Sequence, residues 1–333
     1  MISGAHAAAA TLLGMPIVGV ASRSMDRAAE QAAQLRTVAL TYADLPAGAD
    51  IVVVSTPPQC HAADALAMLA TGAAVVLEKP LCTTLDDADA LVEAAADGRL
   101  LYAENLAYAP MVMQLLSMVP ALGDVDHLEV RTIQSLPTWG QFTSDEWGGG
   151  ALFDLGVHPL AIALLVGAAA GAGAVESVRC TLRGGEGHNS DEHAELTLRF
   201  GAGLEAMVVS SWQASTVLGA DGQIWDVQVS SPTGVLRGDF WPRPSLEHNG
   251  VPVALPTSAA ALPSIEELGY AGQLDAFEDD LDGASAPFMS AAFGRTVLDI
   301  VCAAYRSAGC DGEAEAVPFT GDRSKTPLQL WHG

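Results

Sequence analysis

The N-terminal third of the chain alternates between short apolar runs and longer segments that favour a helix. Residues 17–22, 51–55, 73–80 and 100–105 are strand-like, apolar on both faces and rich in Val, Ile and Leu. Helical segments of about 10–15 residues separate them, and this spacing is typical of βαβ units around a parallel sheet. The pattern predicts a doubly wound, Rossmann-type α/β domain over residues 1–106.

Prolines, a threonine and a glycine mark where these elements end. Pro57 and Pro58 must terminate the strand 51–55 because proline cannot continue a hydrogen-bond ladder. Thr84 is suited to cap the helix that follows residues 73–80, and Gly72 is suited to close the helix before them. The remaining helix of this region is predicted over residues 25–35.

The pattern of predicted elements changes in the second part of the chain. After a helix at residues 110–119, strands follow one another across short turns. Residues 127–135, 194–200 and 204–212 alternate apolar and polar positions, which predicts an antiparallel sheet. Helices at 270–283 and 290–309 close the fold. We expect residues 107–333 to form an α+β domain with a large, mainly antiparallel open sheet. An exposed sheet needs covering, which favours a homodimer or homotetramer.

Composition restricts the partners of this protein. The 333 residues carry a formal charge of −25, which argues against nucleic acid and anionic membranes because both need a positive surface. Five scattered cysteines without a CxxC spacing indicate reduced thiols and a cytoplasmic protein rather than a metal site. No basic segment precedes an apolar one at the start, and residues 160–175 are too short for a membrane span, so we expect a buried helix and a turn there. A small-molecule partner is the remaining expectation.

Three motifs carry candidate chemistry: "STPPQCH" at residues 55–61, "EKP" at residues 78–80 and "GGGALFDLGVHPL" at residues 148–160. Lys79, one of two lysines in the chain, follows an apolar strand within "EKP", and Asp154 and His158 follow a triple glycine. Ligands bind beyond the carboxyl ends of strands in a doubly wound sheet, which is where Lys79 falls. The spacing of Asp154 and His158 puts them on one helix face, where the carboxylate can fix the imidazole tautomer. Pro159 should disturb that helix. Lysine, aspartate and histidine together form a proton-transfer set.

The order of these motifs resembles one known family. "TPP" with a histidine three residues later, then "EKP", then "GGG" with Asp-x-x-x-His is similar to the glucose-fructose oxidoreductase and inositol dehydrogenase (Gfo/Idh/MocA) family. The resemblance implies that Lys79 contacts the reacting hydroxyl, that His158 is its acid and base, and that Asp154 orients them. It also implies a nicotinamide cofactor held by residues at the strand ends. These residues are Ser3, Ser22, Arg23, Thr56, Pro57, Pro58, His61, Glu78, Lys79 and Asn105.

The chain departs from the family at its beginning, where the first strand and two glycines of the phosphate loop are absent. Ser3 stands near the third glycine position, and His6 matches a frequent histidine of the family. We expect the natural chain to extend upstream, in preference to a diverged, cofactor-poor relative. A chain that begins at Met1 should bind the cofactor weakly, which titration beside an extended chain would test.

The residues that follow the run 17–22 bear on cofactor choice. Ser22 and Arg23, with Arg27 nearby, suit a 2′-phosphate better than a ribose hydroxyl, so NADP is favoured over NAD. The leading hypothesis is hydride transfer to or from a sugar, inositol or related polyol. A cofactor-retaining glycosidase and a non-catalytic regulatory relative are the alternatives. Specificity is expected in the loops 134–147 and 213–223, where Trp139 and Trp147 either stack on a sugar or pack inside.

Overall fold

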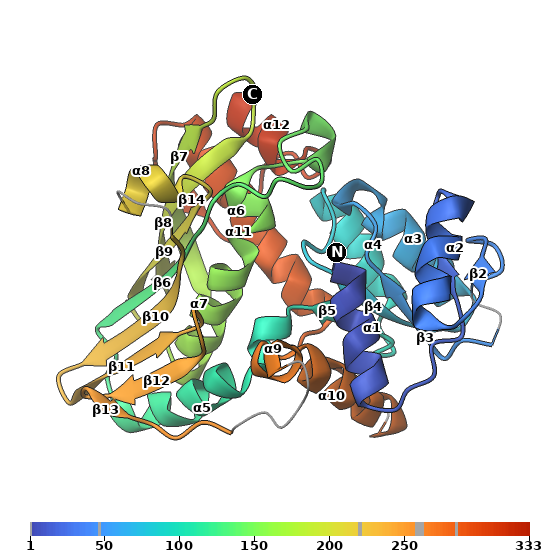
Figure 1. The fold of residues 1–333 in the computed structure, drawn as a ribbon. Helices are drawn as coiled ribbons and strands as arrows, with labels where there is room; N and C mark the ends of the chain where they lie inside the picture. The colour runs from blue at the N-terminus through green and yellow to red at the C-terminus, as the bar shows by residue number, and fades with distance from the viewer. Residues whose placement is uncertain (1, 46–47, 219–221, 257–262, 284–285) are drawn as a thin grey trace.

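The computed structural model describes residues 2–45, 48–218, 222–256, 263–283 and 286–333 (Figure 1). The N-terminal elements are α1 (Ile2–Leu12), β1 (Val20–Ala21), α2 (Met25–Leu35), β2 (Ala39–Leu40), β3 (Ile51–Val54), α3 (Pro58–Ala70), β4 (Ala74–Glu78), α4 (Leu85–Ala94), β5 (Leu100–Ala103) and η1 (Asn105–Tyr108). Strands and helices alternate as predicted, and Thr84 caps α4 by accepting a hydrogen bond from the Asp87 N–H. The domain boundary expected after residue 106 falls within η1.

The parallel strands form two sheets rather than one. Strands β3, β4 and β5 pair in parallel in that order, whereas β1 pairs only with β2 in a separate two-stranded sheet. The predicted strand at 17–22 is therefore shorter than expected, at Val20–Ala21. Strand β4 is buried along its whole length, which explains why it is apolar on both faces. Its carboxyl end delivers Glu78 and Lys79 to the same edge as the ends of β3 and β5.

The C-terminal part is built on a nine-stranded sheet in the order β13-β12-β11-β10-β6-β9-β8-β7-β14. Its strands are β6 (His127–Ile133), β7 (Val175–Gly184), β8 (Asp191–Phe200), β9 (Glu205–Ser211), β10 (Ile224–Ser231), β11 (Gly234–Asp239), β12 (Ser245–His248), β13 (Val251–Pro252) and β14 (Glu315–Ala316). All neighbours are antiparallel except β6 and β9. The predicted large, mainly antiparallel sheet is confirmed.

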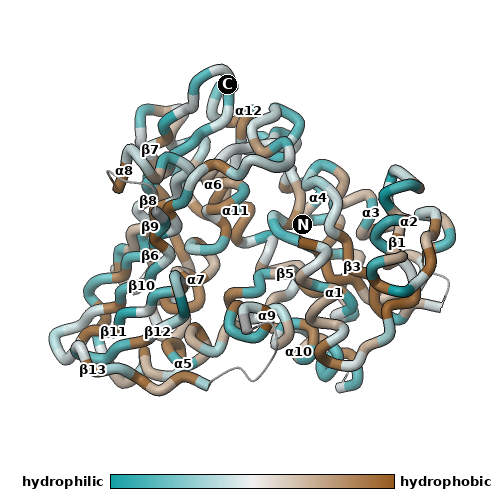
Figure 2. Tube along the Cα trace, in the orientation of Figure 1, coloured by the Kyte–Doolittle hydropathy of each residue, from teal (hydrophilic) through white to brown (hydrophobic). Residues whose placement is uncertain are grey.

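Helices pack on this sheet and join it to the N-terminal part. They are α5 (Pro110–Met118), η2 (Val119–Leu122), η3 (Asp145–Trp147), α6 (Ala151–Asp154), α7 (Val157–Ala169), α8 (Ala214–Leu218), α9 (Pro263–Glu267), α10 (Tyr270–Gly283), α11 (Ala291–Gly309) and α12 (Pro327–His332). The apolar helix α7 packs on β6 and β9 with most of its residues buried, while polar residues gather at the outer turns (Figure 2). Helix α11 packs against both β7 and α4, so it links the two parts.

No single helix in the described ranges is long and apolar enough to cross a membrane. Residues Asp145–Asp154 and Val157–Ala169 pass that test only together, as a pair bent by 47°. The helix and turn expected over residues 160–175 are present, because α7 ends at Ala169 and Gly171 follows with a positive φ.

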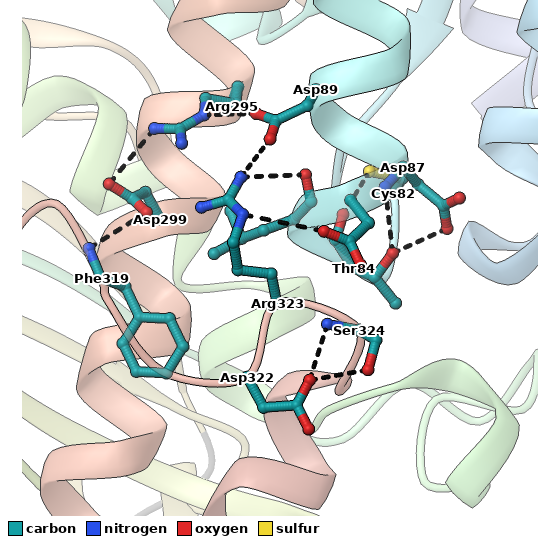
Figure 3. A network of polar contacts seen from close by, with 12 residues as sticks. Cys82, Thr84, Asp87, Asp89, Arg295, Asp299, Phe319, Asp322, Arg323 and Ser324 are labelled. Atoms are coloured by element: carbon teal, nitrogen blue, oxygen red, sulfur yellow. Dashed lines mark hydrogen bonds and ion pairs between the residues drawn. The ribbon is translucent and has the colours of Figure 1, made fainter.

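A polar network ties the C-terminal segment to α4 (Figure 3). The Arg323 carbonyl accepts hydrogen bonds from the Leu85 N–H at 3.1 Å and the Asp86 N–H at 3.3 Å, so it satisfies two free donors at the start of α4. The Arg323 guanidinium pairs with Asp89, which also accepts from Arg295 of α11 at 3.1 Å. Residues of α4, α11 and the C-terminal segment thus hold the two parts together.

Candidate active site

Lys79 of the N-terminal part meets Asp154 of the C-terminal part. Its Nζ donates to the Asp154 carbonyl at 2.9 Å and to Asp154 Oδ1 at 3.3 Å. The two side chains are 18% and 9% exposed, which leaves the ammonium and the carboxylate at the edge of solvent. The structure thus brings together two of the three residues predicted to act in proton transfer.

The segment that carries Asp154 and His158 is not one continuous helix, contrary to the prediction from their spacing. Asp154 is the last residue of α6, and Gly156 precedes α7, where His158 is the second residue. A Cβ at Gly156 would lie 2.6 Å from the Leu152 carbonyl oxygen and 2.7 Å from Ser210 Oγ, so only glycine fits this close approach to β9. Pro159 lies in the first turn of α7, where a missing N–H costs no intrahelical bond. The expected disturbance inside the helix is therefore wrong, because the break comes before it.

The imidazole of His158 is held by Glu104 rather than by Asp154. His158 Nδ1 lies 2.7 Å from Glu104 Oε1 and 2.9 Å from Oε2, and Glu104 is fully buried beyond the end of β5. A carboxylate there accepts from Nδ1–H, which leaves Nε2 as the ring nitrogen that can accept a proton. No partner for Nε2 occurs within the described ranges. The predicted contact between Asp154 and His158 is absent among the same residues.

Sequence reasoning missed Glu104, although a signal was present. It follows the strand 100–103 directly, as Glu78 ends the strand before it, and it precedes the predicted cofactor residue Asn105. Carboxyl ends of neighbouring parallel strands meet at one edge, so a charged residue there is a candidate ligand or positioning group.

Glu78 forms a second buried pair with a histidine. His6 Nε2 lies 2.6 Å from Glu78 Oε1, which links α1 to the end of β4. Burial by itself raises the pKa of the Glu78 carboxyl, but the hydrogen bond and charge of His6, with the charge of Lys79, outweigh it and lower the pKa below its usual range. Glu78 is thus kept ionised beside Lys79.

His61 joins the ends of β3 and β4 to each other. Its Nδ1 lies 2.8 Å from the Pro80 carbonyl oxygen and its Nε2 lies 2.7 Å from the Thr56 carbonyl oxygen. Burial lowers the pKa of this imidazole, although both carbonyls favour its charged form. Because both ring nitrogens have backbone partners, we expect His61 to affect a cofactor by positioning Thr56 and Pro80.

The remaining predicted cofactor residues lie at the carboxyl ends of the parallel strands or on α1. Thr56 Oγ1 donates to Asp64 at 2.7 Å. Pro57 is the N-cap of α3, and the buried Pro58 is its first residue. Asn105 follows β5, and its Nδ2 donates to the Leu268 carbonyl at 2.7 Å. These residues lie beyond the carboxyl ends of β3 and β5, and their role in holding a cofactor stays a prediction.

The other cofactor candidates surround the two-stranded sheet. Ser3 Oγ accepts a hydrogen bond from Gln31 of α2 at 3.1 Å, which ties α1 to α2. Ser22 and the exposed Arg23 follow β1 directly. Of the expected specificity loops, residues 134–147 are described throughout, whereas residues 219–221 of the loop 213–223 lie outside the described residues.

Comparison with protein families gives two matches. Residues 3–105 match a model described as an oxidoreductase family with an NAD-binding Rossmann fold, GFO/IDH/MocA. Residues 119–224 match a model described as the GFO/IDH/MocA C-terminal domain.

Curated relatives include enzymes named for reactions on sugars. A dTDP-3,4-didehydro-2,6-dideoxy-alpha-D-glucose 3-reductase from Streptomyces violaceoruber is 30% identical over 272 residues, which cover 76% of this chain and 78% of the relative. A D-glucoside 3-dehydrogenase from Escherichia coli (strain K12) is 34% identical over 124 residues, 35% of each chain. Several matches are partial, since the chain spans only 35% to 49% of the length of three curated relatives.

Solved structures share the fold at low sequence identity. GenD2 from gentamicin A biosynthesis, in complex with NAD, has a TM-score of 0.81 at 24% identity and covers 95% of this chain and 93% of its own. The WlbA dehydrogenase from Bordetella pertussis, in complex with NADH and UDP-GlcNAcA, has a TM-score of 0.78 at 18% identity and covers 96% and 95%.

Proposed function

The chain belongs to the Gfo/Idh/MocA family of oxidoreductases, and from this premise we propose that it transfers a hydride between a nicotinamide cofactor and a carbinol or carbonyl carbon of a sugar, inositol or related polyol. The observation that carries the proposal is the contact of Lys79 with Asp154, in a site that also holds the His158–Glu104 pair. An ammonium, two carboxylates and an imidazole are thereby assembled from both parts of the chain. This is the set that reversible oxidation of a hydroxyl needs.

Each residue has a role that follows from its contacts. In the oxidation direction His158 Nε2 accepts the proton of the substrate hydroxyl, and Glu104 stabilises the imidazolium that results. Lys79 donates a hydrogen bond to the same oxygen and stabilises its developing negative charge. Asp154 holds the Lys79 ammonium in position. In the reverse direction, the same groups return the proton.

The residues at the strand ends suit a nicotinamide cofactor, which supplies the hydride acceptor when bound. Ser3 and Gly4 begin α1, where a Cβ added to Gly4 would meet no atom within 4 Å, so the backbone is open to a phosphate. Glu78, Lys79 and Asn105 would hold the nicotinamide end. The polar edge formed by the ends of β3, β4 and β5 supports this arrangement.

NADP is the proposed preference of this enzyme. Arg23 is exposed directly after β1, and no ion pair engages it within the described ranges. A guanidinium there, beside Ser22, can bind a 2′-phosphate by charge-assisted hydrogen bonds. Arg23→Ala should weaken NADP about tenfold or more and leave NAD within about twofold, measured by fluorescence titration of the reduced cofactors.

A rate assay tests the proposed function. Reduction of NAD or NADP is followed at 340 nm with a panel of sugars, glycosides and inositols, using the wild type, Lys79→Met and His158→Asn. We expect each variant to lose about 100-fold or more in kcat, since general acid–base catalysis contributes about that much. Lys325→Met, at the other lysine of the chain, is the matched control and should retain full activity.

Two results of that assay would refute the proposal. Aglycone release without net cofactor turnover would indicate the glycosidase alternative. Bound sugar with neither reaction would indicate a non-catalytic relative.

The open sheet also supports a proposed homodimer or homotetramer, since one of its faces carries exposed apolar residues such as Met207. Sedimentation velocity of the purified protein tests this, and a monomer would refute it.

A further inference from the structure

Cations are absent from the sequence segments that surround His158. Residues 132–178 and 200–236 contain no lysine or arginine, and neither do residues 100–130 between them and the N-terminal part. Arg131, between two of these segments, is engaged by Asp226 through two hydrogen bonds of 2.9 and 2.5 Å. Lys79 is therefore the cation that a substrate at His158 would meet, and Asp154 already neutralises it.

Two carboxylates near His158 and the capped N-terminus of α6 make the site unfavourable for an anionic substrate. Glu104 and Asp154 lie beside His158 and Lys79, so their charges repel a phosphate. The start of α6 would otherwise attract an anion, but Asp191 accepts from the Leu152 N–H at 2.8 Å and Tyr305 accepts from the Gly150 N–H at 2.9 Å. Asp191 and Tyr305 are buried, so this position is already filled from inside the protein.

An aromatic cluster packs beside α6 and Trp225. Phe142 packs against Trp139, Trp147 and Trp212, with ring centroids 4.8, 4.9 and 6.2 Å away. The cluster packs on Ala151 and Leu155 of the α6 segment, next to Asp154. The Trp139 side chain is 59% exposed, so a large ring is available to a ligand. Aromatic rings of this kind favour the apolar face of a sugar or an aromatic substituent.

Neutral polar groups line the sheet beneath His158. Trp225 on β10 lies 5.7 Å from His158 between ring centroids, and it is paired across the sheet with Thr132, which is paired with Ser210. Thr132 is 3% exposed, Ser210 is fully buried, and the side-chain polar atoms of all three have no hydrogen-bond partner among the described residues. Hydroxyl and indole groups exchange hydrogen bonds with sugar hydroxyls and bring no charge.

We infer that the substrate is a neutral, unphosphorylated glycoside and not a sugar nucleotide. Its sugar ring lies at Lys79 and His158, and its aglycone or second sugar ring lies on Trp139. This inference rests on the proposed function and deepens it, because it selects one substrate class. Charge complementarity selects that class. A diphosphate would meet carboxylates, and the sequence segments around His158 offer it no cation besides Lys79 and Arg131, which are paired with Asp154 and Asp226. A neutral ring finds aromatic faces and neutral hydrogen-bonding groups.

The test compares methyl β-D-glucoside, phenyl β-D-glucoside and UDP-glucose with the wild-type holoenzyme. We expect kcat/KM for phenyl β-D-glucoside to exceed that for UDP-glucose by about 100-fold or more. Trp139→Ala should raise KM for the phenyl glucoside about fivefold more than for the methyl glucoside, and Trp139→Phe should restore most of the difference. Trp241→Ala, at an exposed tryptophan outside the cluster, should change neither KM.

Calorimetric titration of the same ligands separates this inference from the proposed function. Binding of the phenyl glucoside without oxidation would refute the proposed function and support the substrate class. Equal or better binding or turnover of UDP-glucose would overturn the inference, and so would failure of both glucosides to bind.

Discussion

Replacing Glu104 with glutamine tests how the buried carboxylate acts on His158. Both Glu104 oxygens lie within 2.9 Å of His158 Nδ1, and Glu104 is fully buried, so its charge is poorly screened. Glutamine has nearly the same shape and can still accept one hydrogen bond from Nδ1. The variant therefore removes the negative charge while it keeps the contact.

The expected loss follows from the difference between two kinds of hydrogen bond. A bond to a charged group contributes about 1.5–3 kcal/mol, compared with about 0.5–1.5 kcal/mol for a neutral one. The difference is felt most when His158 carries the substrate proton, since the imidazolium then faces an amide. The midpoints of the two ranges differ by about 1.2 kcal/mol, which corresponds to a rate about eightfold lower.

The assay measures kcat and KM at 340 nm with the best sugar of the panel. We expect kcat of Glu104→Gln to fall about eightfold, while the cofactor KM stays within about twofold. Glu93→Gln, on the exposed side of α4, is the matched control. A Glu104→Gln enzyme with kcat within twofold of the wild type would refute the role assigned to this carboxylate.

Three further predictions concern stability. Arg323→Ala should lower the free energy of unfolding by about 1 kcal/mol in low salt, because its ion pairs are partly exposed, and by less in about 1 M NaCl; urea unfolding at both salt levels checks this. Burial raises the pKa of Asp191, so this group stabilises the fold at acidic pH and loses that contribution as the pH rises through the raised pKa. The stability of Asp191→Asn relative to the wild type should therefore increase between about pH 4 and pH 7, and a flat or falling difference in urea titrations would contradict this. Amide hydrogens of β1 and β2, in a separate two-stranded sheet, should exchange much faster than those of the buried β4, and equal protection in hydrogen-exchange mass spectrometry would count against the split sheet.

Local patterns predict much of this fold because many elements are determined by nearby residues. Helix α2 begins and ends where its alanine-rich segment does, and α10 matches its predicted range. The Thr84 cap was predictable for the same reason, since its partner Asp87 is three residues away. Strand pairing depends on distant residues, so neither the separate β1–β2 sheet nor the parallel pairing of β6 with β9 could be foreseen.

In the candidate site too, features set by nearby residues were predictable and features set by distant residues were not. Lys79 and the Asp154–His158 pair stand in short motifs that the sequence displays directly. The sequence did not predict the role of Glu104 because its partner His158 is 54 residues away, and only the fold brings the two side chains together. The break at Gly156 was also missed, since a four-residue spacing suggests one helix while tight packing against Ser210 determines where the chain turns.

Isotope transfer tests the central claim most directly. The enzyme is given a glucoside deuterated at every ring carbon together with oxidised cofactor, and the reduced cofactor is analysed by mass spectrometry and NMR. Direct hydride transfer predicts one deuterium at C4 of the reduced nicotinamide. Conversion of the sugar with no deuterium in the reduced cofactor would contradict the account.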